Sequence, residues 1–360
     1  MTTIRWGVIG TGAIAHVFAR DMQRVTESQI VAVSSRDAAK AEAFGATYGA
    51  KECFGDFQQM VQQSSADVIY VATPNTAHLD NCLAALEAGK AVLCEKPFAM
   101  TTEQARQIVE LARSKNLFCM EAMWMRCLPA IRKLVDRIQQ GAIGPVRHLS
   151  ADFGYPVADD PDSRFYNAEL GGGALLDRGV YTLALAQAIL GNPANVVSVA
   201  EKAATGVDRQ SAILLQYESG AIATLSCRLD VESSNEAIIS GTKGIVRMDA
   251  PFFNPPCVSV LPKSNQPTWP PQDLTSGSSP GLAQKVVGKL KSNRYVRNLK
   301  KLLPGSGGES WGGTSEGAGY QFEIAHVNDC LRAKNTESSW MPLSDTLQTM
   351  ELMDRIHQAW

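Results

Sequence analysis

Several marks of membrane, secreted and nucleic-acid-binding proteins are absent from the 360-residue sequence. No run approaches the roughly 18 uninterrupted apolar residues of a membrane-spanning helix. The N-terminus passes from Met1 directly into a strand-like segment and lacks the basic and apolar regions of a signal peptide. The formal net charge is only −2, which argues against an obligatory nucleic-acid or membrane-surface partner.

Metal-binding and disulfide motifs are absent as well. The eight cysteines are scattered without a C-x-x-C pair, and the five histidines include no H-x-x-x-H pair. In a chain of this size, such cysteines are typical of small buried side chains in a reducing compartment. We therefore expect no disulfide framework, no metal site and a cytoplasmic location.

The sequence does contain enough apolar material for a large core, with 45% hydrophobic and 19% charged residues. Over the first 120 residues, short apolar runs alternate with helical stretches, which predicts a parallel, doubly wound α/β sheet. We expect strands at 4–9, 30–33, 68–71, 91–94 and 118–120, and helices at 13–25, 37–48, 76–88 and 101–115.

The pattern changes after residue 140. Strand-like runs follow at 146–153, 196–200, 211–217, 221–227, 237–240 and 244–248, with helices at 173–190, 316–333 and 343–359. They predict an α+β domain with an open, mostly antiparallel sheet. Because one face of this sheet has no helix left to cover it, we expect a homodimer, or a tetramer of such dimers, joined sheet to sheet.

A segment at about 261–319 interrupts this second domain. It is rich in Pro, Gly and Ser and contains a basic stretch, 285–301, without an acidic residue. A solvated surface helix is the favoured interpretation of that stretch, and a site for an anionic partner is the alternative. The predicted organisation is a first domain over 1–122 and a second over 123–360 that carries this insertion.

A glycine-rich motif, G-T-G-A-I-A at 10–15, follows the first predicted strand and opens the first predicted helix. In that context the pattern binds a dinucleotide. Gly10 permits the tight turn, and Gly12 lets the backbone approach a pyrophosphate. Ala13 and Ile14 begin the helix whose N-terminus would face the phosphates. Residues 1–122 are therefore predicted to form a dinucleotide-binding Rossmann domain.

The end of the second strand indicates which dinucleotide is preferred. An acidic residue there would accept hydrogen bonds from a ribose 2′-hydroxyl, but the chain has Ser34, Ser35 and Arg36. A hydroxyl and a guanidinium suit a 2′-phosphate, so NADP is favoured over NAD. Asp37 follows at once, and it is either a helix cap or a ribose ligand.

Two further motifs lie at strand ends, where open α/β sheets bind ligands. Thr73, Pro74 and Asn75 follow the strand at 68–71, and Glu95-Lys96-Pro97 follows the strand at 91–94. Lys96 is a surface charge or a catalytic acid/base. For the second role its pKa would have to fall toward neutrality, which partial burial beside a positively charged nicotinamide would favour.

A third constellation lies in the segment 171–181. Asp177 and Tyr181 are four residues apart on a predicted helix, so they share one face. A carboxylate and a phenol on one face can position hydroxyl groups and relay a proton. Spacing alone allows equally a tyrosine packed in the core with an aspartate near a helix N-terminus.

Combined, these motifs resemble the glucose–fructose oxidoreductase / inositol dehydrogenase family. The resemblance rests on G-x-G at 10–12, E-K-P at 95–97, E-A-M-W-x-R at 121–126 and G-G-G-A-L-L-D at 171–177. Within the family, the chain is most similar to the branch of dimeric dihydrodiol dehydrogenases and NADP-dependent xylose dehydrogenases. The likeness covers most of the chain outside 261–319.

The resemblance implies an NADP(H)-dependent dehydrogenase that acts on a hydroxyl-bearing carbon of a sugar, polyol or diol. It implies that Lys96 is the catalytic acid/base, in a motif whose proline usually follows a cis peptide bond. Asp177 and Tyr181 would be its catalytic partners, with Tyr181 standing where many members have histidine. Trp124 and Phe153 fall where this branch lines its substrate pocket with aromatic rings.

The resemblance and the motifs together predict which residues contact the substrate and the cofactor. The substrate would contact Trp124, Phe153, Asp177 and Tyr181. The cofactor would contact Gly10, Gly12, Ala13, Ile14, Ser35, Arg36, Thr73, Pro74, Asn75, His78, Glu95, Lys96, Trp124 and Arg126.

Two other functions compete with this one. An aldose–aldose oxidoreductase would never release its cofactor, and purified protein carrying bound nucleotide would support it. A regulatory protein could sense NADP(H) without turnover. The presence of Lys96, Asp177 and Tyr181 speaks against a sensor, which needs no acid/base set.

The cofactor preference yields a first prediction. If Arg36 contacts the 2′-phosphate, Arg36→Ala should weaken NADP+ binding by about 1–3 kcal/mol, through loss of a charge-assisted hydrogen bond. Calorimetric titration with both nucleotides should show NAD+ binding nearly unchanged. An equal loss for NAD+ would mean that Arg36 supports the loop and does not recognise the phosphate.

Overall fold

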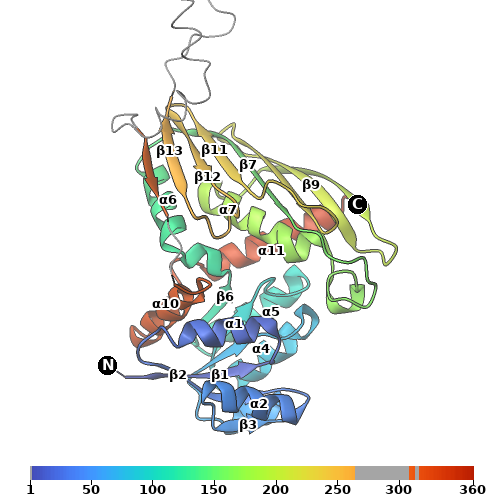
Figure 1. Cartoon of the computed structure of the whole chain (residues 1–360), viewed down its shortest axis with the longest axis vertical. Helices are drawn as coiled ribbons and strands as arrows, with labels where there is room; N and C mark the ends of the chain where they lie inside the picture. The colour runs from blue at the N-terminus through green and yellow to red at the C-terminus, as the bar shows by residue number, and fades with distance from the viewer. Residues whose placement is uncertain (1, 264–307, 313–315) are drawn as a thin grey trace, which may run out of the picture.

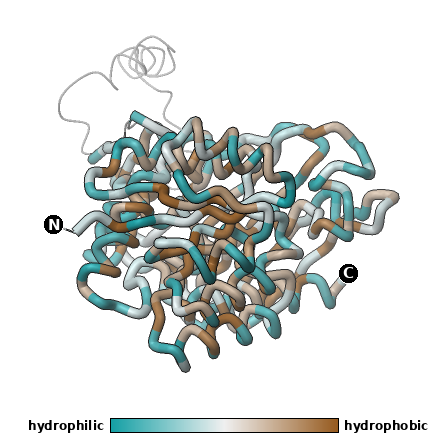
Figure 2. Tube along the Cα trace, turned by 90° about the horizontal axis from the view of Figure 1, so that it is seen from below, coloured by the Kyte–Doolittle hydropathy of each residue, from teal (hydrophilic) through white to brown (hydrophobic). Residues whose placement is uncertain are grey.

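The computed structural model describes residues 2–263, 308–312 and 316–360. A Rossmann-type layer lies at one end and a broad, slanted sheet at the other, with helices between them (Figure 1). Apolar segments gather toward the interior and hydrophilic segments toward the outside (Figure 2). No helix among the described residues is long and apolar enough to cross a membrane.

The first sheet is parallel and has the strand order β3-β2-β1-β4-β5-β6, the doubly wound arrangement that the sequence predicts. Its strands are β1 (Ile4–Ile9), β2 (Ser28–Ser34), β3 (Glu52–Phe54), β4 (Val68–Val71), β5 (Ala91–Glu95) and β6 (Cys119–Ala122). Its helices are α1 (Ala13–Met22), α2 (Ala38–Tyr48), α3 (Phe57–Gln63), α4 (His78–Glu87) and α5 (Thr102–Ser114). Strands β4, β5 and β6 are buried throughout, as expected for strands covered on both faces.

The second sheet has eight strands in the order β14-β13-β12-β11-β7-β10-β9-β8. They are β7 (Val146–Gly154), β8 (Asn195–Lys202), β9 (Asp208–Gln216), β10 (Ile222–Arg228), β11 (Ala237–Gly241), β12 (Gly244–Met248), β13 (Val258–Pro262) and β14 (Glu309–Trp311). Every neighbouring pair is antiparallel except β7 and β10. The predicted fold class, a Rossmann domain plus an open and mostly antiparallel sheet, is confirmed.

The two faces of the second sheet differ in what covers them. Helices α6 (Pro129–Gln139), α7 (Val180–Leu190) and α11 (Leu343–His357) lie on the side of the Rossmann layer (Figure 1). On the outer face no helix of the described residues is present, and burial alternates along the strands. Several large apolar side chains are exposed on these strands: Val197, Val199, Leu214, Ile222, Ile245 and Leu261.

Several details differ from the sequence-based expectation. The helix expected over 173–190 opens with a π-helical turn, Leu175–Gly179, and only then becomes α7. The expected insertion at 261–319 begins inside β13 and includes β14, and these two strands pair with each other. The basic stretch 285–301 lies outside the described residues. The elements β3, α3 and α6 were not predicted; β3 and α3 are brief, whereas α6 has eleven residues and was missed despite its amphipathic pattern.

The C-terminal helices connect the two sheets. Helix α10 (Tyr320–Arg332) packs on α1, and the Trp6 indole donates a hydrogen bond of 3.1 Å to Asn328. The Asp21 carboxylate accepts hydrogen bonds from the backbone amides of residues 318–320. Helix α11 contacts α5 on one side and β8 on the other. The domain division at residue 122/123 stays a prediction. Helix α10, which lies in the predicted second domain, packs against α1 of the first.

A buried acid at the end of the first sheet gives a stability prediction. Glu121 on β6 is almost fully buried, and burial raises its pKa to about 7 although the Phe98 amide donates to it. The folded state therefore favours the neutral acid. Its stabilising effect is complete below the ordinary pKa of 4.5 and is lost as pH rises through about 7.

Glu121→Gln should remove this pH dependence, because glutamine keeps an acceptor oxygen and never ionises. Relative to wild type, the variant should gain roughly 2 kcal/mol more stability at pH 8.5 than at pH 5.5, measured by denaturant unfolding. The exposed Glu110→Gln on α5 is the control. A difference that does not change with pH would contradict a neutral Glu121.

Candidate active site

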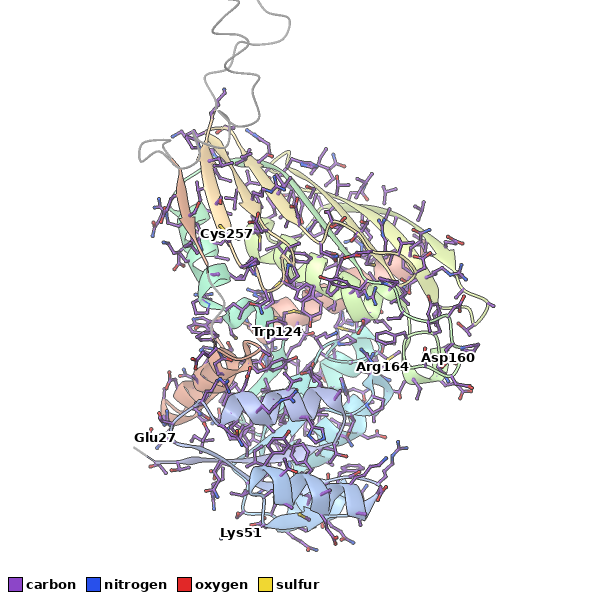
Figure 3. The ribbon with its side chains drawn as sticks, in the orientation of Figure 1. Glu27, Lys51, Trp124, Asp160, Arg164 and Cys257 are labelled. Atoms are coloured by element: carbon purple, nitrogen blue, oxygen red, sulfur yellow. The ribbon has the colours of Figure 1, made fainter. Side chains whose placement is uncertain are left out.

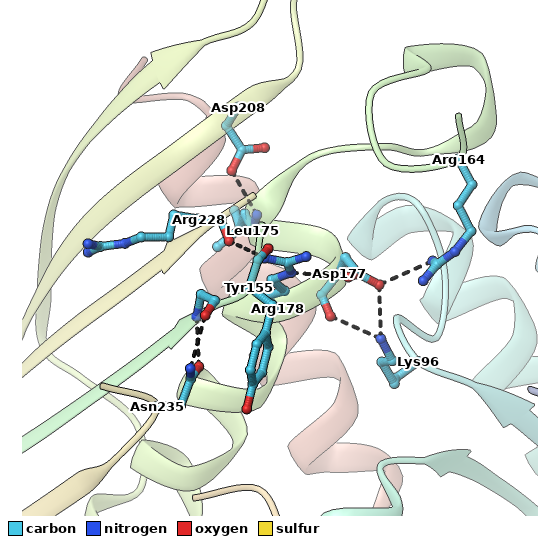
Figure 4. A network of polar contacts seen from close by, with 10 residues as sticks. Lys96, Tyr155, Arg164, Leu175, Asp177, Arg178, Asp208, Arg228 and Asn235 are labelled. Carbon is cyan, nitrogen blue, oxygen red and sulfur yellow. Dashed lines mark hydrogen bonds and ion pairs between the residues drawn. The ribbon is translucent and has the colours of Figure 1, made fainter. Parts of the chain in front are cut away.

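A buried ion pair joins the two sheets. Lys96 directly follows β5, and Asp177 lies in the π-helical turn before α7. The Lys96 ammonium donates to the Asp177 backbone oxygen at 2.9 Å and to its carboxylate Oδ1 at 3.3 Å (Figure 4). The two side chains are only 14% and 15% exposed, so little solvent screens the pair. The Lys96–Pro97 peptide bond is cis, as the resemblance implies.

Three cations surround the Asp177 carboxylate. Besides Lys96, Arg164 Nη1 lies 3.2 Å from Oδ1, and Arg178 Nε lies 3.6 Å from Oδ2. Burial by itself would raise the pKa of Asp177, but these cations lower it to about 2. Asp177 is therefore a fixed anion at any physiological pH.

The chain's own residues hold Lys96 in its charged form. Burial pushes its pKa down, but Asp177, Tyr181 and Glu95 together raise it above the ordinary value. The fall toward neutrality expected beside a positively charged nicotinamide stays a prediction. The ammonium form dominates, and this form can give a proton to a substrate oxygen.

Tyr181 lies beside this pair, and Lys96 contacts both Tyr181 and Asp177. The Lys96 ammonium is 4.8 Å from the centre of the Tyr181 ring, and the Trp124 indole donates to the Tyr181 hydroxyl at 2.9 Å. Burial raises the pKa of Tyr181 to about 12, so the phenol keeps its proton. Tyr181 is therefore buried and also faces Lys96, while its role in proton relay stays a prediction.

Aromatic rings form one wall near Tyr181. Phe153 at the end of β7 lies 5.4 Å from the Tyr181 ring, and Phe253 stacks on Phe153 at 4.5 Å. Trp124 stacks on Tyr320 at the start of α10, with ring centres 5.3 Å apart. Trp124 lies between the two layers (Figure 3). The predicted pair Trp124 and Phe153 thus reaches the site, and Phe253 and Tyr320 join it from segments without a motif.

The loop between β1 and α1 fits a dinucleotide phosphate. Gly10 has φ +99°, and a side chain there would overlap the Ala72 carbonyl. No described atom lies within 4 Å of the place that a Cβ on Gly12 would occupy. Helix α1, which begins at Ala13 followed by Ile14, has no side-chain cap, so its first amides remain available to an anion.

Asp37, which follows β2, caps helix α2, one of the two roles that the sequence left open for it. Its carboxylate caps α2 by accepting from the amides of Ala39 and Lys40, at 3.0 and 3.4 Å. The Ser35 hydroxyl links this turn to Thr11 of the glycine loop at 3.4 Å. Arg36 is exposed and makes no hydrogen bond or ion pair with the described residues. The helix-cap interpretation of Asp37 therefore holds.

The remaining predicted cofactor residues support the strand ends. Asn75, which follows Pro74, donates to the Gly171 carbonyl at 3.1 Å and so links the domains. The buried His78 ring lies 2.9 Å from the Pro97 oxygen and 3.1 Å from the Thr73 oxygen.

Two charged residues of the expected cofactor set have protein partners. Glu95 accepts from the Tyr70 hydroxyl at 2.5 Å. Arg126 forms a largely buried ion pair with Asp345 at 2.8 Å. Direct cofactor contacts for either one stay a prediction.

Sequence reasoning missed the residues that hold the π-helical turn. Arg178 is buried and donates to the backbone oxygens of Tyr155 and Arg228, while Asp208 accepts from the Leu175 amide at 2.7 Å (Figure 4). Arg164 reaches Asp177 from an exposed segment. Arg178 follows Asp177 in the motif and could have been suspected, whereas Arg164 and Asp208 carry no local signal. Among the described residues, no cluster of His, Cys, Asp or Glu could hold a metal ion.

Comparison with known families matches both domains. Residues 4–123 match the model of an oxidoreductase family with an NAD-binding Rossmann fold, GFO_IDH_MocA. Residues 131–247 match the GFO/IDH/MocA C-terminal domain.

Curated relatives align over nearly the whole chain. The trans-1,2-dihydrobenzene-1,2-diol dehydrogenase of Mus musculus is 30% identical over 99% of this chain and 96% of its own length. That of Oryctolagus cuniculus is 32% identical over 98% and 97%.

Solved structures share the fold. A 3-ketoreductase from Actinomadura kijaniata in complex with NADP and TDP-benzene has a TM-score of 0.79 at 23% identity, over 99% of this chain and 98% of that one. An aldose–aldose oxidoreductase from Caulobacter crescentus, complexed with glycerol, has a TM-score of 0.80 at 21% identity, over 99% and 97%.

Fold, site and comparisons together define a two-domain oxidoreductase with a nicotinamide-dinucleotide-binding Rossmann domain. The chain belongs to the Gfo/Idh/MocA family, as its motifs indicated. The predictions of an enzyme and of its family are confirmed.

Proposed function

We propose that the chain is an NADP(H)-dependent oxidoreductase that interconverts a hydroxyl-bearing carbon and a carbonyl in a sugar, polyol or diol. Full-length similarity to dihydrodiol dehydrogenases supports the diol and sugar class. The observation that carries the proposal is the buried Lys96–Asp177 pair beside Tyr181, at the carboxyl end of β5. This is the edge at which a Rossmann sheet presents its cofactor.

The division of labour follows from the geometry. The nicotinamide, when bound, supplies or accepts the hydride. The Lys96 ammonium would donate its proton to the oxygen of a carbonyl as that oxygen becomes a hydroxyl, and would take the proton back in the reverse direction. Tyr181 would orient the same oxygen through its hydroxyl. Asp177 would hold the Lys96 ammonium in place and keep it charged.

The aromatic wall would set the shape of the substrate site. Phe153, Phe253 and Trp124 present apolar ring surface next to the polar trio, and ring faces of this kind pack against the apolar face of a sugar or a cyclic diol. Their bulk also limits the access of water to the Lys96–Asp177 pair. A site with one polar end and one apolar wall suits a substrate that has hydroxyl groups on one side and an apolar face on the other.

For the cofactor, NADP is proposed over NAD. Arg36 and Ser35 lie at the end of β2, and Asp37 is engaged as the cap of α2. A free guanidinium at this position suits the 2′-phosphate, while a carboxylate already committed to two amides is a poor ribose ligand. The eight free thiols support the expectation of a reducing, cytoplasmic environment.

The substitution Lys96→Met tests the acid/base role directly. Methionine preserves length and apolar volume but cannot transfer a proton, so kcat should fall by roughly a hundredfold or more with NADP+ affinity nearly intact. Lys51→Met, on the far side of the Rossmann domain (Figure 3), should leave turnover unchanged. A panel of aldoses, polyols and diols with NADP+ and NAD+ provides the substrates. Comparable turnover in the Lys96 variant would rule out the role.

A homodimer joined through the outer face of the second sheet is also proposed. The face exposes Val199 at 66% and Val197 at 58%, and no helix of the described residues covers it. Soluble monomers seldom expose apolar patches larger than a few hundred Å². A second copy offering the same face would bury it in an isologous contact.

Light scattering at micromolar concentration should therefore give at least twice the chain mass of 38.8 kDa. Val199→Lys should shift the protein toward monomer, because an ammonium group buried in the contact would lose its hydration without gaining a partner. Glu42→Lys on α2 adds the same residue to the Rossmann surface and should not change the mass. A monomeric wild type would contradict the proposal.

A further inference from the structure

Asp208, the first residue of β9, is a buried carboxylate outside the Lys96–Asp177 site. It is only 4% exposed, and Figure 4 shows it on the opposite side of the π-helical turn from Lys96. No motif includes it, and the function proposed above gives it no role. A carboxylate kept out of water at this place needs a reason, because its desolvation is costly.

Two of its contacts lie at the start of the π-helical turn. Asp208 Oδ2 accepts a hydrogen bond of 2.7 Å from the Leu175 amide, across 33 residues of sequence. Gly173 has φ +118°, and a Cβ there would overlap the Asp208 carboxylate. The chain therefore comes so close to Asp208 that only glycine fits at position 173.

The turn has no cap of its own. Ala174 precedes the segment Leu175–Gly179 and offers no side-chain hydrogen bond, so Asp208 does from another strand what an N-cap residue does locally. Asp177 follows Leu175 by two residues. Both acceptors of Lys96, the backbone oxygen and Oδ1, belong to Asp177. A shift of Leu175 would move both acceptors together.

The negative charge of Asp208 matters beyond its shape. Burial raises its pKa to about 7, and the Leu175 amide and Lys202 oppose that rise. In the described part of the chain, the titratable groups that face it are Lys202 on β8 and Cys227 on β10. Burial raises the pKa of Cys227 to about 12, so that thiol stays neutral. A charged acceptor binds an amide more strongly than a neutral one, so the grip on the turn strengthens as Asp208 ionises.

We propose that Asp208 is a positioning residue of the active site: it holds the Leu175 amide and thereby places Asp177 against Lys96. The proposal rests on the proposed function, in which these two residues carry the proton transfer and its alignment. Asp208 touches neither substrate nor cofactor in this account. It acts through the backbone of the π-helical turn.

Two substitutions separate the hydrogen bond from the charge. Asp208→Ala removes the acceptor, so kcat should fall about tenfold or more while NADP+ affinity changes less than twofold. Asp208→Asn keeps an acceptor oxygen and should recover most of that loss. Asp56→Ala removes a similar cap from α3, where the carboxylate accepts from the Gln58 amide at 2.9 Å, and should leave kcat unchanged.

The decisive readout is the ratio of wild-type kcat to Asp208→Asn kcat across pH, because other titrations cancel in it. The ratio should be close to one at pH 5.5, where Asp208 is neutral, and rise to about threefold or more by pH 8.5. Amide exchange of the segment 173–179, measured by mass spectrometry without substrate, should accelerate in the alanine variant and not in the Asp56 control.

Two results would overturn the proposal. One is a ratio that does not vary with pH, and the other is normal kcat in Asp208→Ala. Should the alanine variant fail to fold, the asparagine variant and its pH ratio still decide the question. Failure of the proposed function would look different, as a wild type without turnover on any substrate of the panel, and the exchange measurement would then test the hold on the turn by itself.

Discussion

The arrangement of the whole molecule depends on one buried ion pair. Lys96 directly follows a strand of the parallel sheet, Asp177 stands 81 residues later on the second domain, and each stabilises the charge of the other where little solvent screens the pair. Breaking such a pair by removing one partner typically costs roughly 3–5 kcal/mol, because the remaining charge is stranded. The pair thus links the two domains and also keeps an ammonium group between them.

The second domain is built to hold its half of the pair. Three strands reach the π-helical turn: Asp208 begins β9, Arg228 ends β10, and Tyr155 directly follows β7. Asp208 holds the amide of Leu175, while Arg178 is fixed to the carbonyl oxygens of the other two residues. The inner side of the sheet therefore supports the short segment that carries Asp177, and such support is the condition for accurate placement of a side chain. Its outer face exposes apolar side chains and carries no helix of the described residues.

The sequence was informative where a local pattern carried the information. Apolar runs and the G-x-G turn predicted the parallel sheet, and alternation predicted most strands of the open sheet. Lys96, Asp177, Tyr181, Trp124 and Phe153 were all placed correctly near one another, although their roles stay proposals.

What could not be predicted depends on contacts between distant segments. Arg164, Phe253 and Asp208 reach the site from a loop, a turn and a strand end, none of which has a motif. The rise in the pKa of Lys96 that the chain's own residues cause could not be predicted for the same reason, since Asp177 comes from the other domain. The π-helical turn could not be predicted from local residue spacing either, because contacts with β7, β9 and β10 hold it in place.

The central claim is that Asp177 keeps Lys96 protonated as the proton donor. The most direct test is the pH profile of kcat for NADPH-dependent carbonyl reduction in wild type and in Asp177→Asn. Removing Asp177, the group that raises the pKa of Lys96 most, leaves desolvation opposed only by Tyr181 and Glu95, so the alkaline limb of the profile should move to lower pH. An alkaline limb at the same pH in both proteins would contradict the account.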